Sequence, residues 1–289
     1  MGRSEEDDDS GTGAGMAATD EMYGPGHTDY ELERLTVQAR LIEPITRRWF
    51  VEAGIGAGMR VLDVGSGAGD VALLAAELVG ASGEVIGTDR VATPLSVASR
   101  RAAAKSLTNV RFIEGDPCEM DFDQPFDGVV GRYVLMYQPD PTSTLRRLVE
   151  HVRPGGVVVF HEPYRDGVRS FPPVPTYDRC WQFLDDVLRG TGADSIMGIK
   201  LHSVFVAAGL PAPTMRLEAV IAGGGECDDH IHFEVDPVRS ILPHIERLGL
   251  ARVEDLDVDA LAGRVREELI ESGGVIVGRA EVGAWTRVP

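Results

Sequence analysis

Between residues 59 and 162, short apolar runs alternate with segments whose apolar residues recur at helical spacing. The apolar runs lack strict alternation with polar residues, which is typical of parallel strands covered by helices on both faces. We therefore predict a doubly wound α/β fold. The predicted strands are 60–64, 84–88, 110–114, 126–131 and 157–161, and the predicted helices are 70–79, 94–106 and 141–151.

The pattern continues on both sides of this region. Residues 28–53 have helical spacing after a TDYE capping box, and Pro44 is expected to kink or split that helix. Beyond residue 162 the regularity loosens. Helical patterns are predicted at 177–189, 195–208, 237–248 and 258–271, and strands at 214–222 and from residue 275 onward.

Composition and charge exclude several kinds of partner. The 289 residues carry a formal net charge of −18, of which the seven acids and one base of residues 1–22 account for −6. A body this acidic repels phosphate backbones and anionic lipid, so we expect no nucleic-acid and no membrane partner. The acidic N-terminus lacks the apolar stretch of a secretory signal. Three distant cysteines without a CxxC pair predict no metal site, no disulfides and a cytoplasmic location.

The ligands of doubly wound folds bind beyond the carboxyl ends of the strands, where the first strand here runs into VLDVGSGAGD at residues 61–70. Two spacings fit this turn. Gly67-x-Gly69-x-x-Ala72 matches the dinucleotide fingerprint, with Asp89 placed to bind a ribose. A second spacing, in which glycines at 65, 67 and 69 follow Asp63, adds an acid inside the end of the strand.

Charge separates the two spacings. A pyrophosphate is held by the amides of a helix N-terminus, and carboxylates at Asp63 and Asp70 would repel it. S-adenosylmethionine has no phosphate; it carries a sulfonium, an ammonium and a carboxylate. Acids near the turn suit its ammonium, Asp89 suits the two ribose hydroxyls, and Asp116 suits the adenine amino group, with Pro117 on the ring face. The acids therefore favour the cationic nucleoside.

Five motifs in order strengthen this interpretation. VLDVGSGAGD, GTDR (87–90), EGDP (114–117), FDGVVGRYVLMYQPDP (126–141) and HVRPGGVVVFHEP (151–163) resemble the successive motifs of class I S-adenosylmethionine-dependent methyltransferases. The resemblance covers about residues 30–165 and the last strand. It implies a seven-stranded, mostly parallel sheet whose last strand is antiparallel. TDYELERLTVQARL (28–41) is similar to the N-terminal helix of the branch that includes quinone, sterol and natural-product methyltransferases, where the helix covers the cofactor.

The resemblance and the strand ends together predict the cofactor site. The residues expected to bind S-adenosyl-L-methionine are Asp63, Gly65, Ser66, Gly67, Gly69, Asp89, Arg90, Asp116, Pro117, Arg132 and Tyr133, with Tyr23, Tyr30 and Gln38 from the region of the N-terminal helix. Two alternatives stay open. Asp63 could bond only the amides of the turn, and Gln38 could bond protein backbone rather than the cofactor carboxylate.

Catalysis of methyl transfer requires fewer specific side chains than cofactor binding does. Methyl transfer is an in-line displacement that depends on alignment, and it needs a base only if the acceptor must lose a proton. The candidate bases are His27, His161 and Glu162, of which Glu162 closes a central strand. The candidate substrate residues are Tyr177 and Trp181, one helical turn apart as an aromatic wall, and His232. If HIH (230–232) alternates as a strand, its histidines share a face, but no third metal ligand accompanies them.

We therefore predict one methyltransferase domain that acts on a small, partly apolar acceptor in specialised metabolism, as a monomer or homodimer. After a disordered acidic tail at 1–22, the domain at 23–289 divides into cap helices (23–58), a cofactor-binding core (59–162), a helical substrate lid (163–208 and 224–272) and C-terminal strands (209–223 and 273–289). Three alternatives remain: a nicotinamide-dependent oxidoreductase, a cyclase that retains the bound cofactor, and a non-enzymatic binder.

Overall fold

The computed structural model describes residues 29–224, 227–252, 254 and 256–289, with side chains from residue 41 onward. The predicted tail at 1–22 lies outside these residues. All five predicted core strands and the three helices between them are confirmed. They are β1 (Arg60–Val64), α3 (Asp70–Val79), β2 (Glu84–Asp89), α4 (Ala92–Ala104), β3 (Val110–Glu114), β4 (Phe126–Arg132), α5 (Pro141–Val149) and β5 (Val152–Tyr164).

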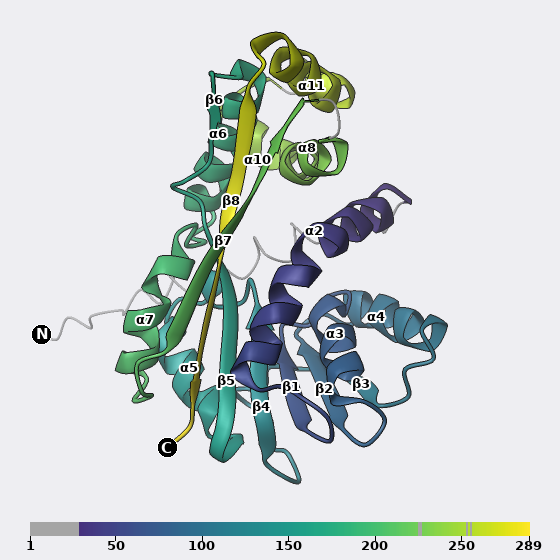
Figure 1. The fold of residues 1–289 in the computed structure, drawn as a ribbon, viewed down its shortest axis with the longest axis vertical. Helices are drawn as coiled ribbons and strands as arrows, with labels where there is room; N and C mark the ends of the chain where they lie inside the picture. The colour runs from purple at the N-terminus through teal and green to yellow at the C-terminus, as the bar shows by residue number, and fades with distance from the viewer. Residues whose placement is uncertain (1–28, 225–226, 253, 255) are drawn as a thin grey trace, which may run out of the picture.

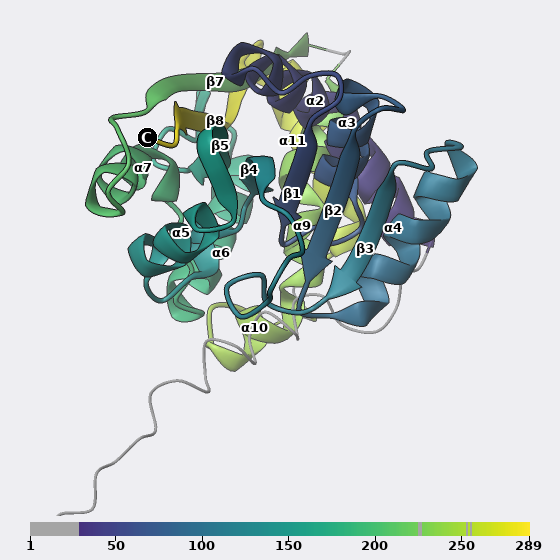
Figure 2. The ribbon, with the colours of Figure 1, turned by 90° about the horizontal axis from the view of Figure 1, so that it is seen from below.

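The strands form one sheet in the order β3-β2-β1-β4-β5-β8-β6, with β7 paired to β8 (Figures 1 and 2). Strands β1 to β5 are parallel, and β8 (Val275–Arg287) is antiparallel to β5, as expected for the last strand. β7 (Thr214–Gly223) is the predicted strand at 214–222. The sheet of the described residues has eight strands rather than seven. The extra strand is β6 (Arg169–Phe171), three residues that pair with the start of β8.

Helices cover both faces of the sheet. α2 (Asp29–Ala53) and α3 contribute Ile42, Trp49 and Leu74 to one apolar cluster, and α5 contributes Leu145 to the cluster on the other face. α2 continues through Pro44 as one helix, so the expected split does not occur. Proline removes a single helical hydrogen bond, and the burial of Ile42 and Trp49 against the sheet offsets that loss.

A third apolar cluster lies beyond the carboxyl ends of the strands, in the segments predicted to form the lid. It includes Tyr177, Ile231 and Val265. The helices around it are α6 (Pro175–Gly190), α8 (Asp228–Val235), α9 (Pro237–Ser240), α10 (Leu242–Arg247) and α11 (Leu261–Ser272). β8 extends from the core into this region (Figure 1). In the described part of the chain, no helix is long and apolar enough to cross a membrane.

Two predictions about the lid were wrong. α7 (Met197–Ala207), expected within the lid, packs on the sheet, where Leu201 and Phe205 are buried in the same cluster as the α5 side chains. The HIH triplet lies in helix α8 rather than in a strand. Three alternating residues fit both periodicities, and the buried Ile231, Phe233 and Val235 on this helix pack against the surrounding elements.

Candidate functional site

The turn between β1 and α3 has the conformation that its glycines allow. Gly65, Gly67 and Gly69 have φ angles of 64°, 51° and 88°, in the left-handed region that other residues avoid. A Cβ at residue 65 would lie 2.9 Å from Val134, and one at residue 69 would lie 2.8 Å from Ala98. A Cβ at residue 67 would meet nothing within 4 Å. Gly67 is therefore the glycine that leaves room for a ligand.

Asp89 joins the end of β2 to this turn. Its Oδ2 accepts the N–H of Gly67 at 2.8 Å, and its Oδ1 accepts the N–H of Val91 at 3.0 Å. Each carboxylate oxygen has a second lone pair, so Asp89 can still accept two hydroxyl hydrogens. The contact to Gly67 also uses an amide that a pyrophosphate would need at a helix N-terminus.

Asp116 follows the next strand end, at the edge formed by β3. Its Oδ1 accepts the N–H of Cys118 at 2.9 Å, and its Oδ2 accepts Arg90 Nη2 at 2.6 Å. Burial would raise the pKa of Asp116, but these two donors outweigh it and lower the pKa. Arg90 thus pairs with Asp116. Pro117 is buried, and its carbonyl oxygen lies 2.8 Å from His151 Nε2.

The two acids that flank the turn differ from their predicted roles. Asp63 is fully buried, and its Oδ2 accepts the Ser66 hydroxyl at 2.7 Å. Burial raises the pKa of Asp63 to about 7, and its Oδ1 has no hydrogen-bond partner within the described structure. Asp70 binds Arg101 at 2.6 Å and lies 3.5 Å from Arg132. These arginines neutralise Asp70, so its charge does not distinguish a pyrophosphate from a cationic nucleoside.

Strand β4 ends at Arg132 and Tyr133, beside the turn. Arg132 is buried, and its Nη1 donates to the Thr46 hydroxyl at 3.3 Å. Tyr133 has a φ of 58°, a costly conformation for a residue with a side chain. Its N–H donates to the His161 carbonyl at 2.9 Å, and its hydroxyl donates to Glu281 at 2.8 Å. Contacts at both ends of Tyr133 hold this strained conformation at a strand end.

His161, a predicted base, has both ring nitrogens engaged. Nδ1 lies 3.1 Å from the Thr46 hydroxyl, and Nε2 lies 2.8 Å from Glu281 Oε2. The ring packs edge-on against Trp49 and Tyr133. Burial lowers the pKa of His161 despite its carboxylate neighbour. With no ring nitrogen open to an acceptor, His161 is a positioning residue that joins α2, β5 and β8.

Glu162, the other described candidate base, is bonded by backbone N–H groups. It is fully buried, and Oε1 accepts the N–H groups of Val134 and Leu135 at 2.9 and 2.8 Å. Oε2 lies 3.3 Å from the N–H of Met136. The carboxyl group thus caps the turn η1 (Leu135–Tyr137), which follows Tyr133. The sequence predicts Glu162 at a strand end, but β5 continues to Tyr164, and no sequence pattern shows which groups meet Glu162.

Strand β8 supplies residues that the sequence interpretation missed. Arg279 donates to Glu281 Oε1 at 2.9 Å and to the Tyr133 hydroxyl at 3.1 Å. The ladder between β7 and β8 changes register between Ala219 and Ile221, and the extra residue on β8 lies at Gly278 and Arg279. Two buried charges within an apolar strand, at alternate positions, were the available signal for this site.

The lid residues are divided between its interior and its surface. Tyr177 is buried, and its hydroxyl donates to the Val277 carbonyl at 3.0 Å. The guanidinium carbon of Arg165 lies 4.8 Å from the centroid of the Trp181 ring. The side chain of His232 is 44% exposed and bonds to Asp236 on its own helix. His232 and the buried His230 lie on opposite sides of α8, because residues two apart on a helix point in opposite directions, and a contact of His232 with the substrate stays a prediction.

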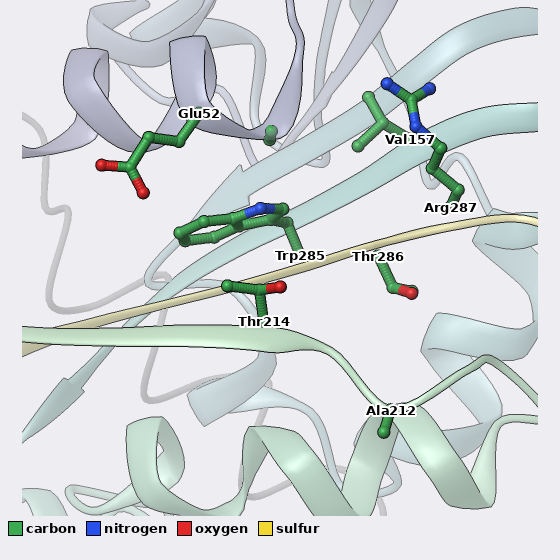
Figure 3. Close-up of a pocket in the computed structure, with 8 residues that line it drawn as sticks. Glu52, Val157, Ala212, Thr214, Trp285, Thr286 and Arg287 are labelled. Carbon is green, nitrogen blue, oxygen red and sulfur yellow. The ribbon is translucent and has the colours of Figure 1, made fainter.

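Four predicted residues are not described at the level of side chains. Tyr30 and Gln38 lie in α2 before residue 41, and Tyr23 and His27 lie outside the described residues. A groove between α2, β7 and β8 is separate from the candidate site (Figure 3). It is lined by Val157 and Trp285, which pair with residues far from the carboxyl ends of the parallel strands.

Comparison with known proteins matches the candidate site to one family. The model of a family described as a methyltransferase domain matches residues 55–181. A 2-phytyl-1,4-naphtoquinone methyltransferase of Synechococcus elongatus is 39% identical over 124 residues, 40% of this chain and 52% of that protein. A demethylmenaquinone methyltransferase of Staphylococcus saprophyticus is 31% identical over 137 residues, 47% of this chain and 55% of that protein.

The chain thus spans about half the length of the curated relatives it matches. A solved structure from Bacillus halodurans C-125, described as a possible methyltransferase, has a TM-score of 0.58 at 17% identity and covers 84% of this chain and 97% of that one. This likeness supports the fold. Residues 55–181, which hold the glycine turn, Asp89 and Asp116, therefore match a methyltransferase domain.

Proposed function

We propose that this chain transfers the methyl group of S-adenosylmethionine to a small, partly apolar organic acceptor. The open space at Gly67, with Asp89 bonded to its amide and Asp116 at the next strand end, is the observation that carries the proposal. When bound, S-adenosylmethionine supplies an electrophilic methyl group on a sulfonium. The protein then has to bind the cofactor and the acceptor, align the two reacting atoms and exclude water from the site.

The residues present fit this cofactor. Gly67 lets the methionine part approach the backbone, Asp89 accepts the ribose hydroxyls, and Asp116 accepts the adenine amino group. Gly65, Gly69, Ser66 and Asp63 shape the turn, Arg132 and Tyr133 bound its methionine side, and Pro117 and Arg90 bound its adenine side. Tyr23, Tyr30 and Gln38 stay candidates for covering the cofactor, and His27 for a base.

A closed, small-molecule acceptor site fits the apolar lid cluster around Tyr177 and Trp181. The two relatives are named for methyl transfer in naphthoquinone and menaquinone chemistry, which supports small organic acceptors as a class. We place the reaction in specialised metabolism, in the cytoplasm, with the chain as a monomer or homodimer. The net charge of −18 argues against nucleic acid or anionic membrane as partners.

Calorimetry with S-adenosylhomocysteine and with NAD tests the proposal. We expect S-adenosylhomocysteine to bind and NAD not to bind. Asp89→Ala should weaken S-adenosylhomocysteine binding by about 1–3 kcal/mol, the scale of hydrogen bonds to a charged group. Asp123→Ala is the matched control, because Asp123 is exposed and pairs with Arg60 away from the turn. Binding of NAD alone, or unchanged affinity in Asp89→Ala, would contradict this assignment.

The mass of the product distinguishes methyl transfer from cyclisation on the same fold. Methyl transfer adds one methyl group to the acceptor and releases one S-adenosylhomocysteine per product. Cyclisation with a retained cofactor leaves the mass of the acceptor unchanged. A mass-neutral product formed without S-adenosylhomocysteine would replace the proposed reaction by cyclisation.

A further inference from the structure

Three side chains around strand β8 carry buried polar atoms that lack hydrogen-bond partners. They are Arg165, which follows β5, and His230 and Glu234, which lie one turn apart on α8. Arg165 Nε and Nη1, both ring nitrogens of His230, and Glu234 Oε2 have no partner within the described structure. His230 and Glu234 are 3% and 1% exposed, so water does not solvate them freely.

Gly278 on β8 makes the space into which two of these groups fit. A Cβ at residue 278 would lie 2.2 Å from Glu234 Oε1 and 2.8 Å from His230 Cε1. Gly278 also lies at the extra residue of β8, where the ladder with β7 changes register. Any larger residue at this position would displace Glu234, so the missing side chain keeps the group of polar atoms together.

The charges of this group are incomplete without a further partner. Arg279 bonds to Glu281 at 2.9 Å and its backbone N–H donates to Glu234, which leaves Glu234 Oε2 and two nitrogens of Arg165 without hydrogen bonds. Burial lowers the pKa of Arg165 to about 10 and raises that of Glu234 to about 7, while their mutual attraction opposes both changes. Buried polar atoms of charged groups are costly when they lack hydrogen bonds, and a ligand that bonds to the free atoms of both groups would remove that cost.

The position of this group is next to the candidate cofactor site. Arg165 is the residue directly after β5, and its charge interacts with Tyr133 at the end of β4. Glu234 interacts with Arg279, whose guanidinium bonds to the Tyr133 hydroxyl. The unpartnered atoms therefore adjoin the carboxyl ends of β4 and β5, beside the strand end that leads from the glycine turn.

We propose that Arg165, His230 and Glu234 bind the polar end of the acceptor, and that this acceptor carries an acidic hydroxyl group of the phenol or enol type. This inference rests on the proposed methyltransferase function. Glu234 accepts the hydroxyl proton, and Arg165 balances the negative charge that develops on the oxygen. Neutral His230 offers one hydrogen-bond donor and one acceptor to the neighbouring atoms of the acceptor.

The step is balanced without any further reactant. The oxygen uses an electron pair to form a bond to the methyl carbon, while the bond between that carbon and sulfur breaks and its electron pair stays on sulfur. The products are a methyl ether, S-adenosylhomocysteine and protonated Glu234. An acceptor with an ammonium group is disfavoured, because Arg165 repels a cation and a protonated amine has no electron pair with which to attack the methyl carbon.

Binding of three aryl probes with one apolar body tests the class of acceptor. In the presence of saturating S-adenosylhomocysteine, we expect 1-naphthol to bind at least tenfold more tightly than 1-methylnaphthalene or 1-naphthylmethylamine. Equal binding of all three probes, or tightest binding of the amine, would overturn the proposal. Failure of S-adenosylhomocysteine itself to bind would instead refute the proposed function, so the two failures are distinguishable.

Variants then test the individual residues. Arg165→Gln and Glu234→Gln should each remove the preference for 1-naphthol over 1-methylnaphthalene and leave the affinity for S-adenosylhomocysteine within about twofold. Asp228→Asn is the control on the same helix, because this residue is exposed and pairs with Arg266 on α11. Glu234→Asp should restore part of the preference. If both glutamine variants keep the full preference, these residues do not bind the hydroxyl group. Should either variant unfold, the comparison of probes on the unaltered protein still decides the proposal.

Discussion

Glu281 holds the network between core and lid, and its replacement should be among the most damaging single changes in the protein. The carboxylate is 1% exposed. It accepts hydrogen bonds from the Tyr133 hydroxyl at 2.8 Å and Arg279 Nε at 2.9 Å, and lies 2.8 Å from His161 Nε2. Glu281→Gln keeps the shape but removes the charge, and it directs an amide N–H₂ toward groups that donate.

Two independent arguments give the magnitude. Burial would raise the pKa of Glu281, but Arg279, His161 and Tyr133 lower it to about 2, against an ordinary value of 4.5. That difference corresponds to about 3 kcal/mol of stability at neutral pH. Removing one partner from a buried ion pair costs about 3–5 kcal/mol in other proteins, because the remaining charge is left unpaired. Both arguments predict a loss of about 3 kcal/mol or more for Glu281→Gln.

Urea unfolding at pH 7 measures this loss. The matched control is Glu218→Gln, because Glu218 is directly opposite Glu281 on β7 but is half-exposed and pairs with Arg48. A surface pair contributes about 0–1 kcal/mol, so the control should change little. The stability from Glu281 is fully present above its ordinary pKa of 4.5 and is lost as pH falls toward about 2. Equal losses in the two variants at pH 7 would refute the reasoning.

Three further outcomes are expected. Burial raises the pKa of Glu162 to about 8, so the folded state keeps a proton that the unfolded state releases above 4.5. The contribution of Glu162 to stability is therefore full below pH 4.5 and falls by about 1.4 kcal/mol per pH unit up to about pH 8. Glu162→Gln should remove this slope in urea unfolding between pH 6 and pH 8, and parallel curves for the two proteins would contradict the assignment. Gly69→Ala should lower the melting temperature more than Gly67→Ala, because only residue 69 has a neighbour, Ala98, in the way of a Cβ. Gly67→Ala should instead weaken S-adenosylhomocysteine binding in calorimetry, and normal binding by that variant would place the ligand elsewhere.

The periodicity of the sequence was sufficient to predict the core strands and helices, because the local pattern of each segment agrees with the structure that it adopts. Buried parallel strands are continuous apolar runs, and the helices between them have one apolar face, so both are visible within windows of about ten residues. The strand ends then placed Asp89, Asp116 and Tyr133 at one edge of the sheet without knowledge of any contact.

The contacts that give these residues their roles depend on the whole fold. Tyr133 and Glu281 are 148 positions apart in the chain, and His161 and Glu281 are 120 apart. No local pattern predicts that Glu162 would meet three backbone amides of a neighbouring turn. In the lid, HIH was too short to separate a period of 2 from one of 3.6, so the exposed His232 was chosen in place of the buried His230.

β8 is paired along both of its sides, with β5 and β6 on one side and β7 on the other. Moving the lid away from the sheet would break main-chain hydrogen bonds on both sides of β8. We therefore expect β8 to keep its position during a reaction cycle. The distance along β8 between Glu281 and Gly278 is then fixed. If the acceptor binds to Arg165, His230 and Glu234 as proposed, we expect its length to decide which of its atoms meets the methyl group.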